Sequence, residues 1–129
     1  LQNHAQLTSL EGVNAKDLAK QTQVRDWIQN GVDLCVVDVS FISLELLLPA
    51  LGQVLPAGCR LLTLVKPQFE VGAEALNKRG VVEDSALHTE VKDRILRTLV
   101  KCGFSVNAFV PSRVKGQDGN QEFFAYSIR

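Results

Sequence analysis

The stretch VVDVSFISLELLLPA, residues Val36–Ala50, joins an apolar run to a carboxylate, a short polar turn and a leucine-rich segment. Asp38 stands where the apolar run ends. Ser43 is a residue type that favours the position just before a helix, because its hydroxyl can accept a hydrogen bond from a free backbone N–H. The stretch therefore predicts a buried strand that ends at a carboxylate, followed at once by a helix, as in an α/β protein.

A second apolar run follows this helix. Residues 33–39 (DLCVVDV) and 59–65 (CRLLTLV) contain Val and Leu without polar alternation, which is typical of parallel strands covered on both faces. The helix between them contains Pro49, which we expect to kink it. These features predict two parallel strands joined by a helical crossover.

The carboxy-terminal half predicts a helix and a hairpin. After Asp84 or Ser85, apolar residues recur four positions apart, and Gly103 is a residue type that stops a helix. Residues 104–110 (FSVNAFV) and 122–128 (EFFAYSI) resemble strands, and the loop between them is too short for a helical crossover. We expect an antiparallel pair.

Three other segments are less regular. Residues 5–12 (AQLTSLEG) resemble a short strand, and residues 14–31 a loop followed by a helix. Residues 67–83 form a long connection without a periodic pattern, and a loop of that length inside a compact domain is usually functional or disordered.

Composition narrows the function classes. The 129 residues suit one domain, and no apolar run is long enough to span a bilayer. Fourteen basic and fourteen acidic residues cancel, so a domain that grips nucleic acid unaided is not indicated. Residues 1–12 (LQNHAQLTSLEG) have neither a basic start nor an apolar signal core, and Cys35, Cys59 and Cys102 lack metal-ligand spacing. We expect a cytoplasmic protein whose thiols are reduced core residues.

Three charged residues lie at the predicted strand ends. Asp38 and Lys66 follow the two parallel strands, and Glu122 opens the last one. Because an open α/β sheet binds ligands outside the carboxyl ends of its strands, we expect the three side chains to meet at one rim. Each has a simpler explanation alone: a cap, a surface lysine and a solvated charge. The combination favours acid–base chemistry.

Four segments, VVDVSFISL, LVKPQFEVG, GVVEDSALHTEV and GNQEFF, resemble the FtsJ-like methyltransferase domain of the TlyA family, often labelled haemolysin A. The resemblance runs from about Val13 to the end of the chain. It implies a Rossmann-like fold, S-adenosylmethionine as cofactor, no metal, and 2′-O-methylation of ribosomal RNA or ribosomal subunits. By motif, Asp38, Lys66 and Glu122 match three members of the family's lysine, aspartate, lysine, glutamate tetrad.

The resemblance also implies a role for each residue. Lys66 would remove the proton of the ribose 2′-hydroxyl, Asp38 would hold the ammonium and the cofactor in register, and Glu122 would orient the lysine or the ribose. VNAKDL matches a loop that approaches the adenine, so Asn14 is a candidate cofactor neighbour or a turn residue. Arg113 and Lys115 would contact RNA phosphates or remain solvated. The same two possibilities apply to residues 77–80 (NKRG).

The family's first lysine and its Gly-rich cofactor turn have no counterpart in these residues. We therefore expect residues 1–129 to be the carboxy-terminal part of a methyltransferase domain, truncated at the amino terminus, with a mixed sheet that ends in an antiparallel hairpin. Such a chain should be inactive alone. Without its neighbours, the strand predicted at residues 5–10 should form a homo-oligomer through the exposed edge, pair directly with residues 34–39, or be disordered.

Two alternatives remain. DVSF resembles the acidic, two-spacer, aromatic motif of base amino-methyltransferases, in which Phe41 would stack on a flipped base, although that chemistry needs no lysine at position 66. A non-catalytic binding or membrane-active module would fit the haemolysin label, although no amphipathic or spanning segment supports lysis.

Overall fold

The computed structural model describes residues 5–129. Residues 1–4, part of the amino-terminal segment that lacks the features of a signal sequence, lie outside the described residues. The α-helices and strands, in chain order, are α1 (Thr22–Gln29), β1 (Leu34–Val37), α2 (Leu44–Val54), β2 (Arg60–Val65), α3 (Ser85–Lys101), β3 (Ser105–Pro111) and β4 (Phe123–Ile128). Four short 3-10 helices are η1 (Ala15–Lys20), η2 (Pro67–Phe69), η3 (Ala73–Ala75) and η4 (Gln117–Gly119).

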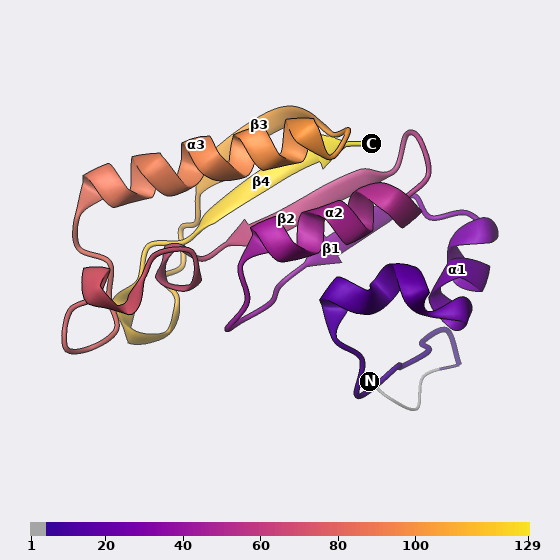
Figure 1. The fold of residues 1–129 in the computed structure, drawn as a ribbon, viewed down its shortest axis with the longest axis horizontal. Coiled ribbons are helices and arrows are strands. Elements are labelled where there is room, and N and C mark those ends of the chain that lie inside the picture. The colour runs from indigo at the N-terminus through magenta and orange to yellow at the C-terminus, as the bar shows by residue number, and fades with distance from the viewer. Residues whose placement is uncertain (1–4) are drawn as a thin grey trace.

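The four strands form one mixed sheet in the order β1-β2-β4-β3 (Figure 1). β1 and β2 pair in parallel, and β4 runs antiparallel to both β2 and β3. The predicted parallel pair and the predicted antiparallel pair are both confirmed. Because β4 runs antiparallel to β2, with Val65 paired to Phe123, the amino-terminal end of β4 lies beside the carboxyl end of β2.

The helices begin and end where their capping residues predict. The Ser43 hydroxyl accepts a hydrogen bond from Glu45 N at 3.2 Å, and the Asp84 carboxylate accepts one from Ala86 N at 2.8 Å. α2 continues through Pro49 to Val54. Beyond α3, Gly103 takes a φ of +91°, a conformation that a side chain would disfavour.

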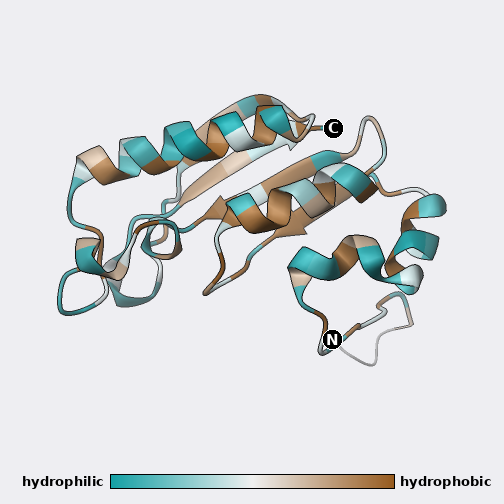
Figure 2. Ribbon diagram, in the orientation of Figure 1, coloured by the Kyte–Doolittle hydropathy of each residue, from teal (hydrophilic) through white to brown (hydrophobic). Residues whose placement is uncertain are grey.

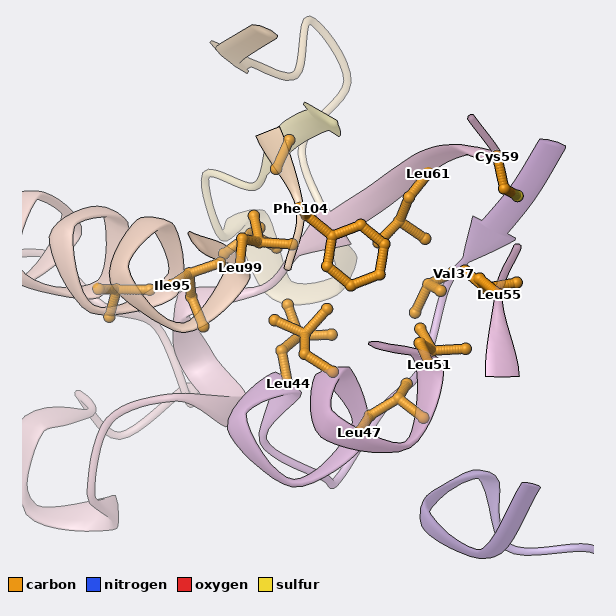
Figure 3. Close-up of a cluster of buried hydrophobic side chains, with 14 residues drawn as sticks. Val37, Leu44, Leu47, Leu51, Leu55, Cys59, Leu61, Ile95, Leu99 and Phe104 are labelled. Atoms are coloured by element: carbon orange, nitrogen blue, oxygen red, sulfur yellow. The ribbon is translucent and has the colours of Figure 1, made fainter. Parts of the chain in front are cut away.

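α2 and α3 pack on the same face of the sheet and enclose the core. Apolar residues three or four positions apart on each helix face inward, as an amphipathic helix requires. Figure 3 shows the resulting cluster, in which Leu44, Leu47, Leu51, Leu55, Ile95 and Leu99 of the helices and their ends meet Val37, Leu61 and Phe104. All of these side chains are buried, and burying each contributes about 1.5–3 kcal/mol before entropy is counted.

The opposite face of the sheet has no helix packed on it within residues 5–129. The side chains on this face are exposed or half-buried, and Figure 2 shows β1 and β2 as largely hydrophobic. The large apolar or aromatic residues on this face are Leu34, Val36, Leu62, Leu64, Val110, Phe124 and Tyr126. The prediction that both faces are covered is therefore wrong for the described chain, and we call these seven residues the open face.

The prediction of a strand at residues 5–12 is also wrong. The structure has turn and irregular backbone there, and none of it pairs with β1. A short segment that has no partner strand cannot satisfy its backbone groups by forming a ladder. The outer edge of β1 is consequently unpaired within the described residues. Residues 14–31 form η1 and α1, as the predicted loop and helix suggest.

The cysteines are free and pack in or against the core, as predicted. Burial raises the pKa of all three thiols, to about 11 for Cys35. Among residues 5–129, no group of side chains has the composition of a metal site. In the same part of the chain, no helix combines the length and the apolar character needed to cross a membrane.

Candidate active site at the carboxyl ends of β1 and β2

Asp38 and Lys66 form an ion pair at the rim of the sheet. Asp38 directly follows β1, and Lys66 directly follows β2. The Lys66 Nζ atom lies 2.6 Å from Asp38 Oδ1 and donates a hydrogen bond of 3.1 Å to the Ser40 hydroxyl. Both contacts follow from the parallel pairing, which brings the two strand ends to one edge.

The two partners differ in exposure. The side chain of Lys66 is 14% exposed and that of Asp38 is 70% exposed. The lysine side chain is therefore largely enclosed, whereas the aspartate side chain faces solvent and has room to meet a ligand. This arrangement gives a fixed nitrogen beside an accessible anion.

Glu122 lies directly before β4, at the same edge of the sheet. Val65 of β2 pairs with Phe123 of β4, so the next position along places Lys66 opposite Glu122. Glu122 is buried, and its Oε1 atom accepts a hydrogen bond of 2.9 Å from Gln68 Nε2. Within residues 5–129 no ion pair joins Glu122 to Lys66. The structure therefore brings Asp38 and Lys66 into contact, whereas Glu122 is linked to the segment after β2 through Gln68.

An aromatic pair borders the Lys66 ammonium. The rings of Phe41 and Phe69 lie 4.9 Å apart, and Lys66 Nζ is 6.0 Å from the centre of the Phe69 ring. Phe41 is 91% exposed and has a φ of +60°, a left-handed conformation that costs a non-glycine residue about 1–2 kcal/mol. An exposed ring held by a strained backbone is available for contact with a ligand.

These rings line a cavity of about 310 Å³ between the loops at this end of the sheet. The other lining residues are Gln68, Leu76, Gly80, Gln117, Asp118 and Asn120. Gln68 Oε1 is buried and has no hydrogen-bond partner among the described residues. The cavity thus has aromatic walls, and one of its lining residues, Gln68, carries an amide oxygen without a partner among the described residues.

The long connection of residues 67–83 is folded rather than irregular throughout. Asn120 holds its last part, because the Asn120 side chain accepts a hydrogen bond from Val82 N at 3.0 Å and donates one to Gly80 O at 2.9 Å. Lys78 and Arg79 are exposed at the tip of this segment. The NKRG residues therefore lie on the same side of the molecule as the cavity.

Arg113 and Lys115 are exposed, and both line a second cavity of about 450 Å³ with Glu122. Leu64 and Phe124 of the open face also line it. The structure therefore brings the two predicted RNA-contacting cations next to one of the three predicted catalytic residues.

Asn14 has a local role in the structure. Its side chain accepts a hydrogen bond from Lys16 N at 3.2 Å and caps η1. No hydrogen bond or ion pair joins it to Asp38 in the described part of the chain. The turn-residue explanation for Asn14 is the one with an observed contact.

Sequence reasoning did not single out Ser40, Gln68, Phe69 or Glu70. All four lie in the quoted segments VVDVSFISL and LVKPQFEVG, within a few residues of Asp38 or Lys66. Glu70 is buried and accepts hydrogen bonds from the Ser43 hydroxyl at 2.7 Å and from Leu44 N at 2.8 Å. Burial raises the pKa of Glu70, although these two bonds oppose the shift.

Comparison with known proteins places the whole chain in one family. The model of the FtsJ-like methyltransferase family matches residues 1–129. The chain is 35% identical, over 126 residues, to the "16S/23S rRNA (cytidine-2'-O)-methyltransferase TlyA" of Mycobacterium tuberculosis, covering 98% of this chain and 45% of that protein. It is 33% identical, over 128 residues, to "Hemolysin A" of Brachyspira hyodysenteriae, covering 99% of this chain and 52% of that one.

A solved structure agrees with these relatives. The protein named "Putative hemolysin from Streptococcus thermophilus" superposes with a TM-score of 0.85 at 35% identity, covering 100% of this chain and 45% of that one. The chain spans about half the length of these three proteins. The matched family, the identities and the shared architecture lead to one conclusion: this chain belongs to the FtsJ-like methyltransferase family.

Proposed function

We propose that residues 1–129 are the carboxy-terminal part of an S-adenosylmethionine-dependent methyltransferase that modifies a ribose 2′-hydroxyl of ribosomal RNA. The observation that carries the proposal is the 2.6 Å ion pair between Lys66, which is shielded, and Asp38, which is exposed, at the carboxyl ends of two parallel strands. The names of the relatives, which include an rRNA (cytidine-2'-O)-methyltransferase, support the substrate class.

The reaction requires that a weakly acidic hydroxyl lose its proton while its oxygen attacks a methyl group in line. Lys66 is the proposed base: its neutral amine form accepts that proton on Nζ and becomes the ammonium that pairs with Asp38. Asp38 and Ser40 fix the direction of the nitrogen by the contacts described above. Glu122 fixes the segment after β2 through Gln68, so that the base and the ribose keep their relative positions.

The described residues fit part of a cofactor site. S-adenosylmethionine supplies an electrophilic methyl group on a cationic sulfonium, and the exposed carboxylate of Asp38 suits a cationic neighbour. Residues 1–129 contain no Gly-rich turn that would hold the methionine end. We therefore propose that Asp38 is this chain's contribution to cofactor binding and that the remaining contacts come from a segment upstream of it.

The open face and the unpaired edge of β1 support the same conclusion. Apolar side chains such as Val36 are left uncovered by α2 and α3, and parallel strands such as β1 and β2 normally have both faces covered. An upstream segment that adds strands beside β1 and helices over the open face would cover both. The length covered in the relatives, about half, leaves room for it.

RNA contacts are proposed on both sides of Lys66. Phe41 and Phe69 would stack on a base, since an exposed aromatic ring is a typical platform for an unstacked nucleotide. Arg113 and Lys115 would contact phosphates near Glu122. These cations supply local charge in a chain whose net charge is zero.

The test is to identify the methylated atom. The full-length protein that contains this chain is incubated with ribosomal subunits and S-adenosylmethionine labelled in the methyl group, and the RNA is digested to nucleosides for mass spectrometry. We expect a nucleoside methylated on the ribose. A label on an exocyclic base nitrogen would support the amino-methyltransferase alternative, and no label on any subunit would contradict the proposal.

A further inference from the structure

We propose that Glu70 is a positioning residue of the methyl-transfer site, because it locks the loop that carries Asp38 to the turn that carries Lys66. The inference rests on the proposed function and adds a residue to it. Glu70 touches neither the hydroxyl nor the methyl group in this account. It acts on the reaction through the ion pair of Lys66 and Asp38.

The Glu70 carboxylate binds the amino-terminal end of α2 with both of its oxygen atoms. Oε2 accepts a hydrogen bond of 2.7 Å from the Ser43 hydroxyl, and Oε1 accepts one of 2.8 Å from Leu44 N. Its side chain is 1% exposed. The first turn of a helix has free N–H groups and a positive end of the helix dipole, so a carboxylate is held there both by hydrogen bonds and by charge.

Two contacts therefore clamp the same pair of segments. The segment from Lys66 to Glu70 is a single 3-10 turn with its flanking residues. At its first residue, Lys66 binds Asp38 and Ser40, and at its last residue Glu70 binds Ser43 and Leu44. Because the loop between Asp38 and Leu44 is held at both ends, neither end can shift without breaking a contact to this turn.

Arg94 of α3 fixes Glu70 from the other side. Its Nη2 atom donates a hydrogen bond to the Glu70 carbonyl oxygen and lies 3.9 Å from Glu70 Oε2, and its Nε atom lies 3.1 Å from Glu45 Oε2. Arg94 thus contacts both the turn and the start of α2. The clamp is anchored to the longest helix of the chain.

Stability alone does not account for this carboxylate. Ser43 already caps α2 through its bond from Glu45 N. Burial raises the pKa of Glu70 despite the bonds from Leu44 and Ser43, so the charged form is less favourable here than in water. The loop held at both ends also contains Phe41, whose left-handed backbone persists only where its surroundings hold it. The carboxylate holds the loop between Asp38 and Leu44 in a fixed position, and we infer that this benefit to the site offsets the cost of burying the charge.

The test measures methyl transfer in the full-length protein under single-turnover and steady-state conditions. Glu70→Ala should lower kcat by about tenfold or more, since misplacement of reacting groups by about 1 Å costs up to a hundredfold. The KM for S-adenosylmethionine should change by less than about twofold, because Asp38 itself remains. Glu70→Gln should recover most of the rate, as its Oε1 can still accept from Leu44 N and its amide can donate to the Ser43 hydroxyl.

Asp84→Ala is the matched control, because it also removes a carboxylate cap from a helix, at the start of α3. It should cost about 1 kcal/mol of stability and leave kcat unchanged. If Glu70→Ala does not fold, Ser43→Ala tests the same contact and should lower kcat severalfold. A wild-type kcat in the folded Glu70→Ala variant, or in Ser43→Ala in its place, would overturn the proposal.

A Lys66→Ala background separates positioning from general damage. If Glu70 acts through Lys66, adding Glu70→Ala to Lys66→Ala should lower the residual rate by less than about twofold, because coupled residues are not additive. A further tenfold loss would overturn the proposed route of action. Full activity in Lys66→Ala would instead refute the proposed function, whereas an inactive Lys66→Ala with a fully active Glu70→Ala would refute only the role of Glu70.

Discussion

The Nζ atom of Lys66 lies 2.6 Å from Oδ1 of Asp38, yet the lysine side chain is 14% exposed and the aspartate side chain 70% exposed. The pair therefore has an inner cation and an outer anion. In the proposed reaction the inner group handles the proton, while the outer group meets the cofactor. This division of roles leads to different expectations for the two residues.

Replacing Asp38 should impair two steps. Asp38→Ala removes the anion that orients Lys66 and the carboxylate proposed to face the cofactor, so both methyl transfer and affinity for S-adenosylmethionine should fall. Stability should change by no more than about 1 kcal/mol, because the carboxylate is largely solvated. Rate measurements, calorimetric titration and urea unfolding of the full-length protein check the three quantities. Unchanged cofactor affinity would remove Asp38 from the cofactor site.

Neighbouring valines on β1 test the open face. Val36 is 67% exposed, whereas Val37 is 8% exposed and belongs to the core. In the 129-residue chain, Val36→Lys should change the free energy of unfolding by less than about 0.5 kcal/mol, while Val37→Lys should prevent folding or cost several kcal/mol.

The same Val36→Lys substitution should be severely destabilising in the full-length protein if an upstream segment covers the open face. Urea unfolding of both chains gives the comparison. An equally mild effect in the two chains would show that Val36 remains exposed in the longer protein, and it would contradict the proposed cover.

The 129-residue chain should not bind S-adenosylmethionine appreciably. It supplies Asp38, but it has no Gly-rich turn for the methionine end of the cofactor. Isothermal titration should therefore show no heat of specific binding to this chain, with the full-length protein as the positive control. Micromolar affinity in the short chain would place the main cofactor contacts within residues 1–129 and contradict this part of the account.

The stability contribution of Glu70 should depend on pH. Burial raises its pKa above the ordinary value of 4.5, so the folded state holds the proton more tightly than the unfolded state. Its contribution is fully present below pH 4.5 and is lost as the pH rises through the raised pKa. Glu70→Gln has no such loss. The free energy of unfolding of the variant, relative to wild type, should therefore rise across this window, as denaturant titrations at a series of pH values would show. A difference that is constant with pH, or that falls, would contradict the buried placement of Glu70.

The strand ends and helix limits are predictable because local patterns specify them. Ser43 and Asp84 cap helices with their own side chains, and Asp38 and Lys66 follow apolar runs that pair in parallel. Their meeting at one rim follows from the geometry of parallel strands.

Other features depend on partners distant in sequence. The bond between Gln68 and Glu122 and the bonds from Glu70 to α2 join loops whose paths no periodic pattern describes. Residues 5–12 do not form the expected strand, because no neighbouring strand pairs with them among the described residues. The apolar open face, typical of a sheet covered on both sides, faces no helix among residues 5–129.

Methyl transfer by the full-length Lys66→Arg and Lys66→Ala variants tests the central claim most directly. Arginine keeps its proton at any usable pH, so a base at this position fails equally in both variants. The account predicts a loss of more than about a hundredfold in each with cofactor affinity nearly intact. Lys20→Ala, which breaks an exposed 2.7 Å ion pair with Asp17, should be fully active as the matched control. An active Lys66→Arg enzyme would reduce Lys66 to an electrostatic role, and full activity in Lys66→Ala would contradict the assignment of this rim as the methyltransferase site.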